Sequence, residues 1–422
     1  MKIDHVVERY ITKGKQFKLL VMTSLIWMIG AAGVMVLTFA VPDIISEWKI
    51  SSTIMSTIIS STFMGMLIGA ISSGILIDLF GRKSGTIFYL TCSIVFTFLF
   101  GFSNSPQVAV LLRFLSGIGY GGLLPAVNTY LSEYTSIKIR GRYLVLLESS
   151  WAVGSILIAW FAVTFAERFG WRWNFWIFLI GCAIFPFILS EKETPKYIFK
   201  KYGKERLEKS FGKIDDHIES IEESRITLAS LFAKRHLKKT LLVMIAWFTV
   251  SFVYYALFSW APKIFISQLG ISVAQAKWFT FFMYIAQLPG YLSVAYLIEK
   301  IGRKLTLSLY FTGMGISSLS LFLVSGDVSF LTIMLIISFF TLGVWGMVYA
   351  YTPELFPTSF RGTANGFAGA MARVAGIIAP YFTGYFIDKS IFIALIVITI
   401  MSLITGFLVF PLGVETKDKA IN

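Results

Sequence analysis

Residues 78–83 read Asp-Leu-Phe-Gly-Arg-Lys, and residues 299–304, 221 positions later, read Glu-Lys-Ile-Gly-Arg-Lys. The same shift, applied without a gap, aligns further residues: Tyr130 with Tyr351, Glu133 with Glu354, and Arg140-Gly141 with Arg361-Gly362. The matches fall at the same places relative to the apolar stretches of the chain. The sequence therefore predicts two copies of one unit in parallel topology.

The composition is that of a membrane protein. Of the 422 residues, 56% are hydrophobic and 14% charged, and the mean hydropathy is +0.75. Soluble domains average about 45–50% apolar and about 25% charged residues, so a water-soluble fold is disfavoured. A spanning helix needs about 20 apolar residues, and a chain of this length has room for about twelve.

Twelve apolar runs, six in each copy, match that estimate. They lie at 17–40, 53–77, 85–103, 106–131, 143–165, 172–190, 240–262, 278–298, 305–324, 329–351, 362–386 and 390–412. We expect an all-α membrane protein with twelve transmembrane helices in two six-helix bundles related by pseudo-twofold symmetry. The predicted domains are residues 1–190, a polar linker with amphipathic helices at 191–239, and residues 240–422.

The basic residues are distributed unevenly across the predicted membrane. Of 37 Lys and Arg, 29 fall on the side that carries both termini, six on the opposite side, and two, Arg113 and Arg373, within spans. The positive-inside rule then places both termini in the cytoplasm of a multi-pass protein of the cell membrane. The net charge of +14 is accounted for in this way, so no nucleic-acid partner is expected.

Several motifs resemble those of the major facilitator superfamily over nearly the whole chain. Residues 78–83 and 299–304 look like its loop motif, and Arg113 with the glycines at 117, 119, 121 and 122 looks like its fourth-helix motif. Glu193-Thr-Pro-Lys and Glu415-Thr-Lys resemble sugar-porter signatures. The stretches 140–152 and 346–362 are nearer to the niacin-transporter and synaptic-vesicle-protein-like branch. The resemblance implies a monomeric carrier that moves a small solute by alternating access.

The sequence departs from that branch in its first span. Relatives commonly carry acidic residues there, whereas this stretch reads Gly30-Ala-Ala-Gly33 and no acid lies between Phe17 and Ala40. A carboxylate that carries a proton must therefore lie elsewhere. Glu148, in the fifth span, is the one acid well inside an apolar run.

Ionisable residues within spans cost roughly 2.5–3.5 kcal/mol on insertion scales, so each is a functional hypothesis. Arg373 lies ~17 Å into its span, near the midplane, where its guanidinium can hold a carboxylate solute in a bidentate pair. Its alternative is a bond to backbone carbonyls. Glu148 is a candidate proton carrier or a permanently paired acid. Arg113 has a role either in coupling or in packing between helices.

Aromatic and amide side chains at mid-depth are candidates for a solute pocket, which duplicated carriers place near the midplane between their halves. These residues are Trp27, Trp151, Tyr254, Tyr255, Gln287, Trp345 and Asn365. Each has packing or anchoring at the membrane interface as its alternative role.

Charged residues at the cytoplasmic ends form a candidate inner gate, because ion pairs there close when the helix ends converge. They are Asp78, Arg82, Glu133 and Arg140, with their copies Glu299, Arg303, Glu354 and Arg361. The alternative is charge that only sets topology. The repeat preserves acids as well as bases, which favours the gate.

Enzyme signatures are missing from the sequence. There is no phosphate-binding Gly-Lys-Ser/Thr loop and no Cys-X-X-Cys, and Cys92 and Cys182 lie in apolar segments. We expect no enzyme activity, cofactor, metal or disulfide. The leading hypothesis is a proton symporter of a small organic acid, for example an aromatic carboxylate such as nicotinate. A sugar symporter or facilitator is the close alternative, and a non-transporting solute sensor is the alternative from another class.

Overall fold

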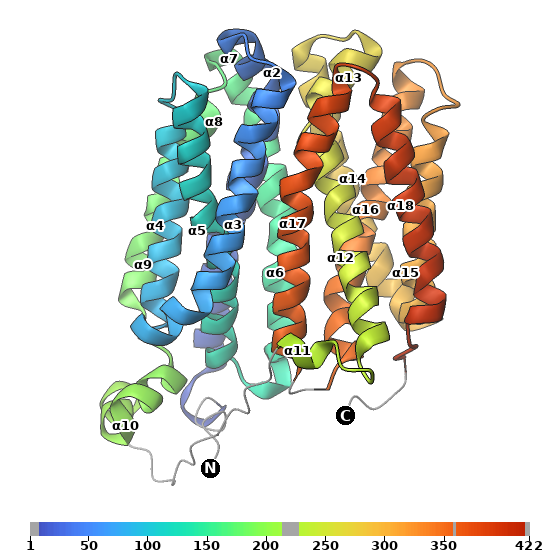
Figure 1. The fold of residues 1–422 in the computed structure, drawn as a ribbon. Coiled ribbons are helices and arrows are strands. Elements are labelled where there is room, and N and C mark those ends of the chain that lie inside the picture. Colours follow the sequence, from blue (N-terminus) through green and yellow to red (C-terminus); the bar gives the residue numbers. More distant parts are fainter. Residues whose placement is uncertain (1–7, 213–227, 358–359, 418–422) are drawn as a thin grey trace. The chain divides into compact units, whose positions relative to one another are not determined.

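The computed structural model describes residues 8–212, 228–357 and 360–417, and within these ranges it contains helices and no strand (Figure 1). The chain forms two compact units. Unit 1 comprises Met1–Leu37 and Ser61–Glu223, and unit 2 comprises Thr38–Ser60 and Ser224–Asn422. The segment Thr38–Ser60, which contains the end of one helix and the start of the next, thus belongs to unit 2.

The helices of the first copy follow one another in chain order. They are α2 (Lys13–Trp48), α3 (Ser52–Phe80), α4 (Arg82–Phe100), α5 (Pro106–Tyr134), α6 (Ile137–Phe161) with the π-helical turn η1 (Ala162–Ala166), α7 (Glu167–Phe169), α8 (Trp173–Trp176), the 3-10 helix η2 (Ile177–Ile184), α9 (Phe185–Ser190) and α10 (Pro195–Phe211). The predicted sixth span is therefore built from α8, η2 and α9.

The second copy has the same order of long helices. The long helices are α12 (Leu237–Phe258), α14 (Val273–Ile301), α15 (Arg303–Ser320), α16 (Asp327–Leu355), α17 (Arg361–Ile387) and α18 (Ile391–Leu412). Two short helices, α11 (Leu228–Leu231) and α13 (Ala261–Leu269), lie before and after α12. The predicted linker contains α10 and α11, and its residues 213–227 lie outside the described part of the chain.

Eleven helices in the described ranges are long and apolar enough to cross a membrane. The remaining predicted span, 305–324, corresponds to α15, whose 18 residues include several hydroxyl side chains. Two of these hydroxyls bond to α18: Ser308 Oγ donates to the carbonyl of Gly406 at 2.8 Å and Ser318 Oγ to that of Leu395 at 3.5 Å. Its hydroxyl groups and the two basic residues at its start make this helix less apolar than the other predicted spans.

Glycines bring α3 and α5 into backbone contact. A Cβ at Gly117 would overlap the carbonyl oxygen of Thr62, and one at Gly121 would overlap that of Met66. In lipid, helices gain little from burying apolar surface against each other, so close packing through small residues supplies much of their attraction. The glycine-rich sequence of α5 therefore serves helix packing in unit 1.

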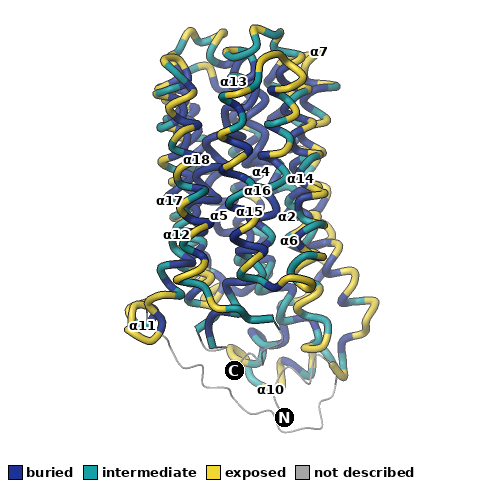
Figure 2. Tube along the Cα trace, turned by 90° about the vertical axis from the view of Figure 1, so that its right-hand side faces the viewer, coloured by how far each residue is buried: buried dark blue, intermediate teal, exposed yellow. Residues whose placement is uncertain are grey.

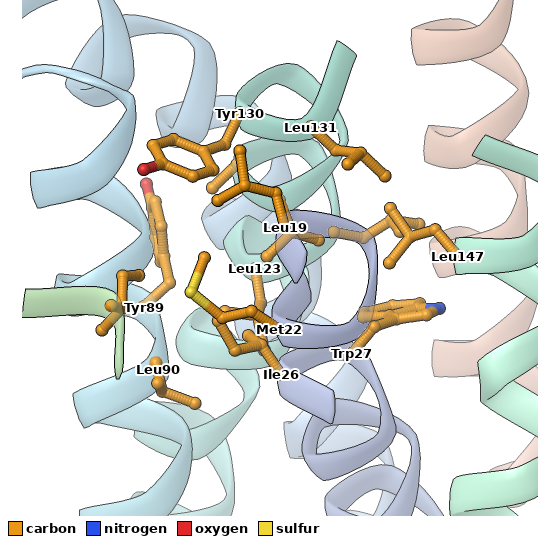
Figure 3. Close-up of a cluster of buried hydrophobic side chains, with 14 of the residues drawn as sticks. Leu19, Met22, Ile26, Trp27, Tyr89, Leu90, Leu123, Tyr130, Leu131 and Leu147 are labelled. Atoms are coloured by element: carbon orange, nitrogen blue, oxygen red, sulfur yellow. The ribbon is translucent and has the colours of Figure 1, made fainter. Parts of the chain in front are cut away.

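Apolar side chains fill the interior of unit 1 between these helices. Figure 3 shows Leu19, Met22 and Ile26 of α2 close to Leu123 of α5 and Leu147 of α6, all of them buried. Along the long helices, buried and exposed positions alternate (Figure 2). Many exposed positions carry large apolar side chains, which suits a surface in contact with lipid.

Candidate functional site

A cluster of polar and aromatic side chains lies within unit 1. Glu148 is the twelfth of the 25 residues of α6, deeper than predicted because the helix begins at Ile137. Its Oε1 accepts a hydrogen bond from Asn128 Nδ2 at 3.1 Å. One turn further along α6, the Trp151 ring lies 5.2 Å from the ring of Trp27. Three predicted site residues, Trp27, Glu148 and Trp151, are thus brought together.

Two atoms of this cluster lack a hydrogen-bond partner among the described residues. Trp27 Nε1 is a buried donor and Asn128 Oδ1 a buried acceptor. Buried polar groups in native structures nearly always have partners, so a donor and an acceptor left open suggest contacts to a solute. Asn128 was not among the predicted residues, although an amide inside the apolar stretch of α5 is a signal that points to it.

Arg113 does not belong to this cluster. It lies 15 residues before Asn128 on α5, about 22 Å along the helix. Its buried Nε donates to Thr62 Oγ1 at 2.9 Å and its Nη1 to the carbonyl of Gly33 at 3.1 Å. No carboxylate in the described ranges pairs with it. These contacts tie α5 to α2 and α3 and match the packing alternative, while a role in coupling stays a prediction.

Arg373 occupies the middle of α17, as the thirteenth of its 27 residues. Its side chain is half-buried, and Nη1 donates to the carbonyl of Gly369 at 3.3 Å. Its Nε is buried without a partner, and no described carboxylate forms an ion pair with it. Tyr255 of α12 lies within electrostatic range of this guanidinium. A mid-helix cation with open donors is thus present in unit 2.

Unit 2 also contains linked aromatic rings and one buried amide. Tyr254 lies 6.3 Å from Trp345, and Tyr284 lies within electrostatic range of Tyr255. Gln287, one turn from Tyr284 on α14, is fully buried, and neither its amide nitrogen nor its amide oxygen has a partner. Tyr284 was missed by the sequence analysis because a tyrosine in an apolar span reads equally well as packing.

Asn365, by contrast, lies apart from these residues. It is the fifth residue of α17 and exposed, about 12 Å along the helix from Arg373. A contact with a solute held at Arg373 stays a prediction.

The predicted gate residues form equivalent ion pairs within each unit, at the helix ends that carry residues 78–83 and 299–304. We call these the motif ends. In unit 1, Arg82 Nη2 lies 3.0 Å from Glu133 Oε1, and Asp78 lies 3.0 Å from Arg82. In unit 2 the corresponding distances are 3.1 Å for Arg303 to Glu354 and 3.4 Å for Arg303 to Glu299.

The two remaining gate candidates have other contacts. Arg140 Nη2 donates to the carbonyl of Thr135 at 3.1 Å. Arg361 is the first residue of α17, and its Nε is buried without a partner. A gate made by these eight residues stays a prediction.

The acids of the two sugar-porter-like signatures cap helices at the motif ends. Glu193 accepts from the backbone N–H of Lys83 at 3.0 Å, and Glu415 accepts from those of Arg303 and Lys304 at 2.9 and 3.1 Å. A carboxylate is stabilised at a helix N-terminus by its free N–H groups. Gly81 and Gly302 precede these helices with φ of 106° and 87°, a conformation that favours glycine.

The threonines that follow these acids connect both sets of contacts. Thr194 Oγ1 donates to Glu133 at 2.6 Å, and Thr416 Oγ1 donates to Glu354 at 2.5 Å. Burial alone would raise the pKa of Glu415, but hydrogen bonds from four backbone N–H groups outweigh it and lower that pKa. At each motif end, one network of hydrogen bonds and ion pairs therefore connects the arginine, its acidic partner and the start of the following helix.

An ion pair that the sequence analysis did not anticipate lies within unit 2. Lys277 Nζ of α14, almost fully buried, lies 2.8 Å from Asp43 Oδ2, near the end of α2. The first turns of α3, which also belong to unit 2, contact α17, since Ser56 Oγ donates to the carbonyl of Pro380 and Ser60 Oγ to that of Ile377. These contacts explain why the segment Thr38–Ser60 belongs to unit 2.

A duplicated, all-helical protein with this number of spans and polar clusters at mid-helix is a multi-pass membrane protein of the transporter class. Comparisons with known proteins agree. The family model described as "Sugar (and other) transporter" matches residues 9–422. The chain therefore belongs to this transporter family of the major facilitator superfamily, as the motifs predicted.

Two relatives align along nearly their whole length. A Bacillus subtilis (strain 168) protein named "Putative niacin/nicotinamide transporter NiaP" is 34% identical, with 96% of this chain and 98% of the relative aligned. The "Niacin transporter NiaP" of Acinetobacter baylyi (strain ATCC 33305 / BD413 / ADP1) is 32% identical, with 96% and 95% aligned. Both are named as transporters of a small molecule.

A solved structure confirms the predicted fold. The inward-open xylose transporter XylE from E. coli superposes with a TM-score of 0.74 at 18% identity, covering 96% of this chain and 98% of that one. The prediction of an all-α membrane protein with twelve spans in two six-helix bundles is thus confirmed. At this level of identity the likeness concerns the fold alone.

Proposed function

We propose that this protein is a proton-coupled symporter of a small aromatic carboxylate such as nicotinate. Arg373 carries this proposal: it is a guanidinium at mid-helix with open donors and no carboxylate partner among the described residues. An unpaired cation in a span is costly unless something compensates it, and a carboxylate solute does so through a bidentate pair. The names of the two aligned relatives support a pyridine carboxylate.

The aromatic residues of unit 2, of which Tyr255 is within electrostatic range of Arg373, suit an aromatic solute. Tyr254, Tyr255 and Trp345 present rings in the same unit, and aromatic rings prefer offset-stacked or edge-to-face contacts with each other. A flat pyridine ring can be held among them while its carboxylate faces the guanidinium.

Glu148 is proposed as the proton carrier. It lies at mid-helix, is half-buried, and accepts a hydrogen bond from the neutral amide of Asn128. The affinity of a carboxylate for a proton depends on its burial and on neighbouring charges, so a change in its surroundings during the cycle can load and release the proton. Binding of proton and solute to separate residues provides the coupling that a symporter needs.

The proposed orientation and gating follow from charge. The motif ends are proposed to face the cytoplasm, in the plasma membrane, because basic residues concentrate on that side of the chain. Alternating access is proposed to involve the ion-pair networks at these ends, with the protein acting as a monomer. A reporter fused at the C-terminus is expected to be cytoplasmic, and an external signal would contradict this orientation.

A sugar is the second candidate, favoured by Gln287. A fully buried amide with both its nitrogen and its oxygen unpaired is suited to the hydroxyl groups of a neutral polyol. This candidate differs from the first in a measurable way, since a neutral solute gains little from Arg373.

Uptake into proteoliposomes containing the purified protein tests both candidates. We expect a pH gradient to drive accumulation of nicotinate, and nicotinamide, which lacks the carboxylate, to compete poorly. Arg373→Lys keeps the positive charge but cannot form the bidentate pair with a carboxylate. The apparent affinity for nicotinate is therefore expected to fall about tenfold or more. Unchanged nicotinate affinity in this variant, or uptake of xylose in place of nicotinate, would overturn the proposal. Binding of nicotinate without flux would indicate a sensor.

A further inference from the structure

A hollow at the motif end of unit 1 lies apart from the residues proposed above to bind solute and proton. It has a volume of about 730 Å³ and lies between the first turn of α4, residues 191–193 and α10. Figure 1 shows α10 beyond the ends of the long helices of this unit. Four basic side chains are among its lining residues: Lys83, Lys192, Arg206 and Lys209.

The acids that line the hollow are largely engaged by groups other than these four side chains. Glu191 is held by the ammonium groups of Lys15 and Lys18, which come from α2. Glu193 accepts from the backbone N–H groups of Lys83 and Thr194. Neither carboxylate therefore pairs with any of the four basic side chains that line the hollow.

The third acid of the lining, Glu205, compensates one of the four bases. It pairs with Lys209 at 2.8 Å, on the surface of α10. Three basic side chains of the lining then remain without a carboxylate partner among the described residues.

These three bases have only neutral contacts or none in the described ranges. Lys83 Nζ donates to the carbonyls of Leu189 and Glu191, each at 2.7 Å. Lys192 Nζ donates to the carbonyl of Ser210. Arg206 is exposed, and its guanidinium forms no hydrogen bond or ion pair with a described residue. The hollow therefore concentrates positive charge that the described protein leaves uncompensated.

We propose that this hollow binds a phosphate-bearing anion. Two ammonium groups and a guanidinium around one space match the several oxygens of a phosphate, and arginine can bind it in a bidentate manner. The hydroxyl groups of Ser84, Tyr202 and Ser210, also in the lining, can donate as well. Because Lys83 belongs to α4 and Arg206 to α10, an anion held by both ties α10 to the helix that follows the Gly-Arg-Lys motif.

The bound phosphate group can belong to either of two kinds of molecule. A lipid headgroup is one, since exposed apolar side chains such as Leu79, Phe80 and Leu189 lie in the adjoining helix ends. A soluble phosphorylated metabolite is the other. The site is independent of the solute and proton sites, so it can be tested without a transport assay.

Thermal unfolding of the purified full-length protein in detergent is the test. One series adds sodium pyrophosphate and the other adds dioctanoyl phosphatidylglycerol, with NaCl adjusted to constant ionic strength so that screening does not change. A ligand that binds the folded protein raises the Tm as its concentration increases. The variants are Arg206→Gln, Arg206→Lys and the matched control Lys200→Gln, which removes an exposed charge of α10 outside the lining.

We expect at least one ligand to stabilise the wild type, with the apparent affinity about tenfold weaker in Arg206→Gln. Arg206→Lys should be intermediate, and Lys200→Gln should behave like the wild type. Stabilisation by both ligands indicates that phosphate alone is sufficient, and stabilisation by the lipid alone indicates a headgroup with its chains. The proposal is overturned if neither ligand stabilises the protein, or if Arg206→Gln and Lys200→Gln weaken binding equally.

Discussion

Glu148 and Arg373 lie at the centres of equivalent helices in the two copies, α6 and α17. Under the 221-residue shift, Glu148 aligns with Gly369, the residue whose carbonyl accepts a hydrogen bond from Arg373 at 3.3 Å. A duplicated scaffold thus carries an acid at mid-helix in one copy and a base at nearly the same level in the other. This difference between the copies suggests separate roles for the two residues.

Replacing Glu148 tests the role in proton coupling. Glu148→Gln mimics the protonated acid and keeps an oxygen that can accept from Asn128. We expect this variant to lose accumulation of nicotinate driven by a pH gradient, and to retain exchange between two loaded compartments. Both are measured in proteoliposomes with labelled solute. A variant that still concentrates nicotinate would show that Glu148 is structural.

The arginines at the motif ends test the gate. Arg140→Ala or Arg361→Ala is expected to shift the population toward the inward-open state, with expression and folding largely kept. The readout is the labelling of single cysteines from each side of the membrane. Arg142→Ala, at an exposed position of the same helix as Arg140, is the control. Labelling that is the same in all three variants would contradict a gating role.

Glu415 tests the network in unit 2 through its pH dependence. Its lowered pKa means that its contribution to stability is present above the ordinary glutamate pKa of about 4.3 and is lost as pH falls through the lowered value. Glu415→Gln should therefore reduce the Tm at pH 7, and its difference from wild type should shrink below about pH 4. Glu205→Gln, at an exposed position of α10, is the control and should change the Tm little. A difference independent of pH would refute this account.

The ion pair between Lys277 and Asp43 tests how the segment Thr38–Ser60 is held in unit 2. Lys277 is nearly buried, so Lys277→Met leaves the Asp43 carboxylate without this partner. We expect a loss of roughly 1–3 kcal/mol, seen as a lower Tm, because one charge of a largely buried pair is left behind. Adding Asp43→Asn should recover part of the loss. If the double variant is less stable by the sum of both single losses, the two charges do not interact.

Much of the architecture could be predicted from the sequence. Apolar runs long enough to span a membrane are local features of the chain, and the repeat at 221 residues relates them in pairs without any knowledge of contacts. The repeat also preserves the 51-residue separation of Arg82 from Glu133 and of Arg303 from Glu354, and both pairs form in the structure. Charge and motif order, which are also local, indicated the family.

The partners of individual side chains depended on how the helices pack. That Asn128 meets Glu148, that Arg113 binds Thr62, and that Lys277 reaches Asp43 all depend on the rotation and approach of helices distant in sequence. In an apolar span nearly every face is compatible with lipid, so the hydrophobic pattern does not specify which face turns inward. Close contacts between glycines and backbone carbonyls set those rotations, and they exist only once the helices have assembled.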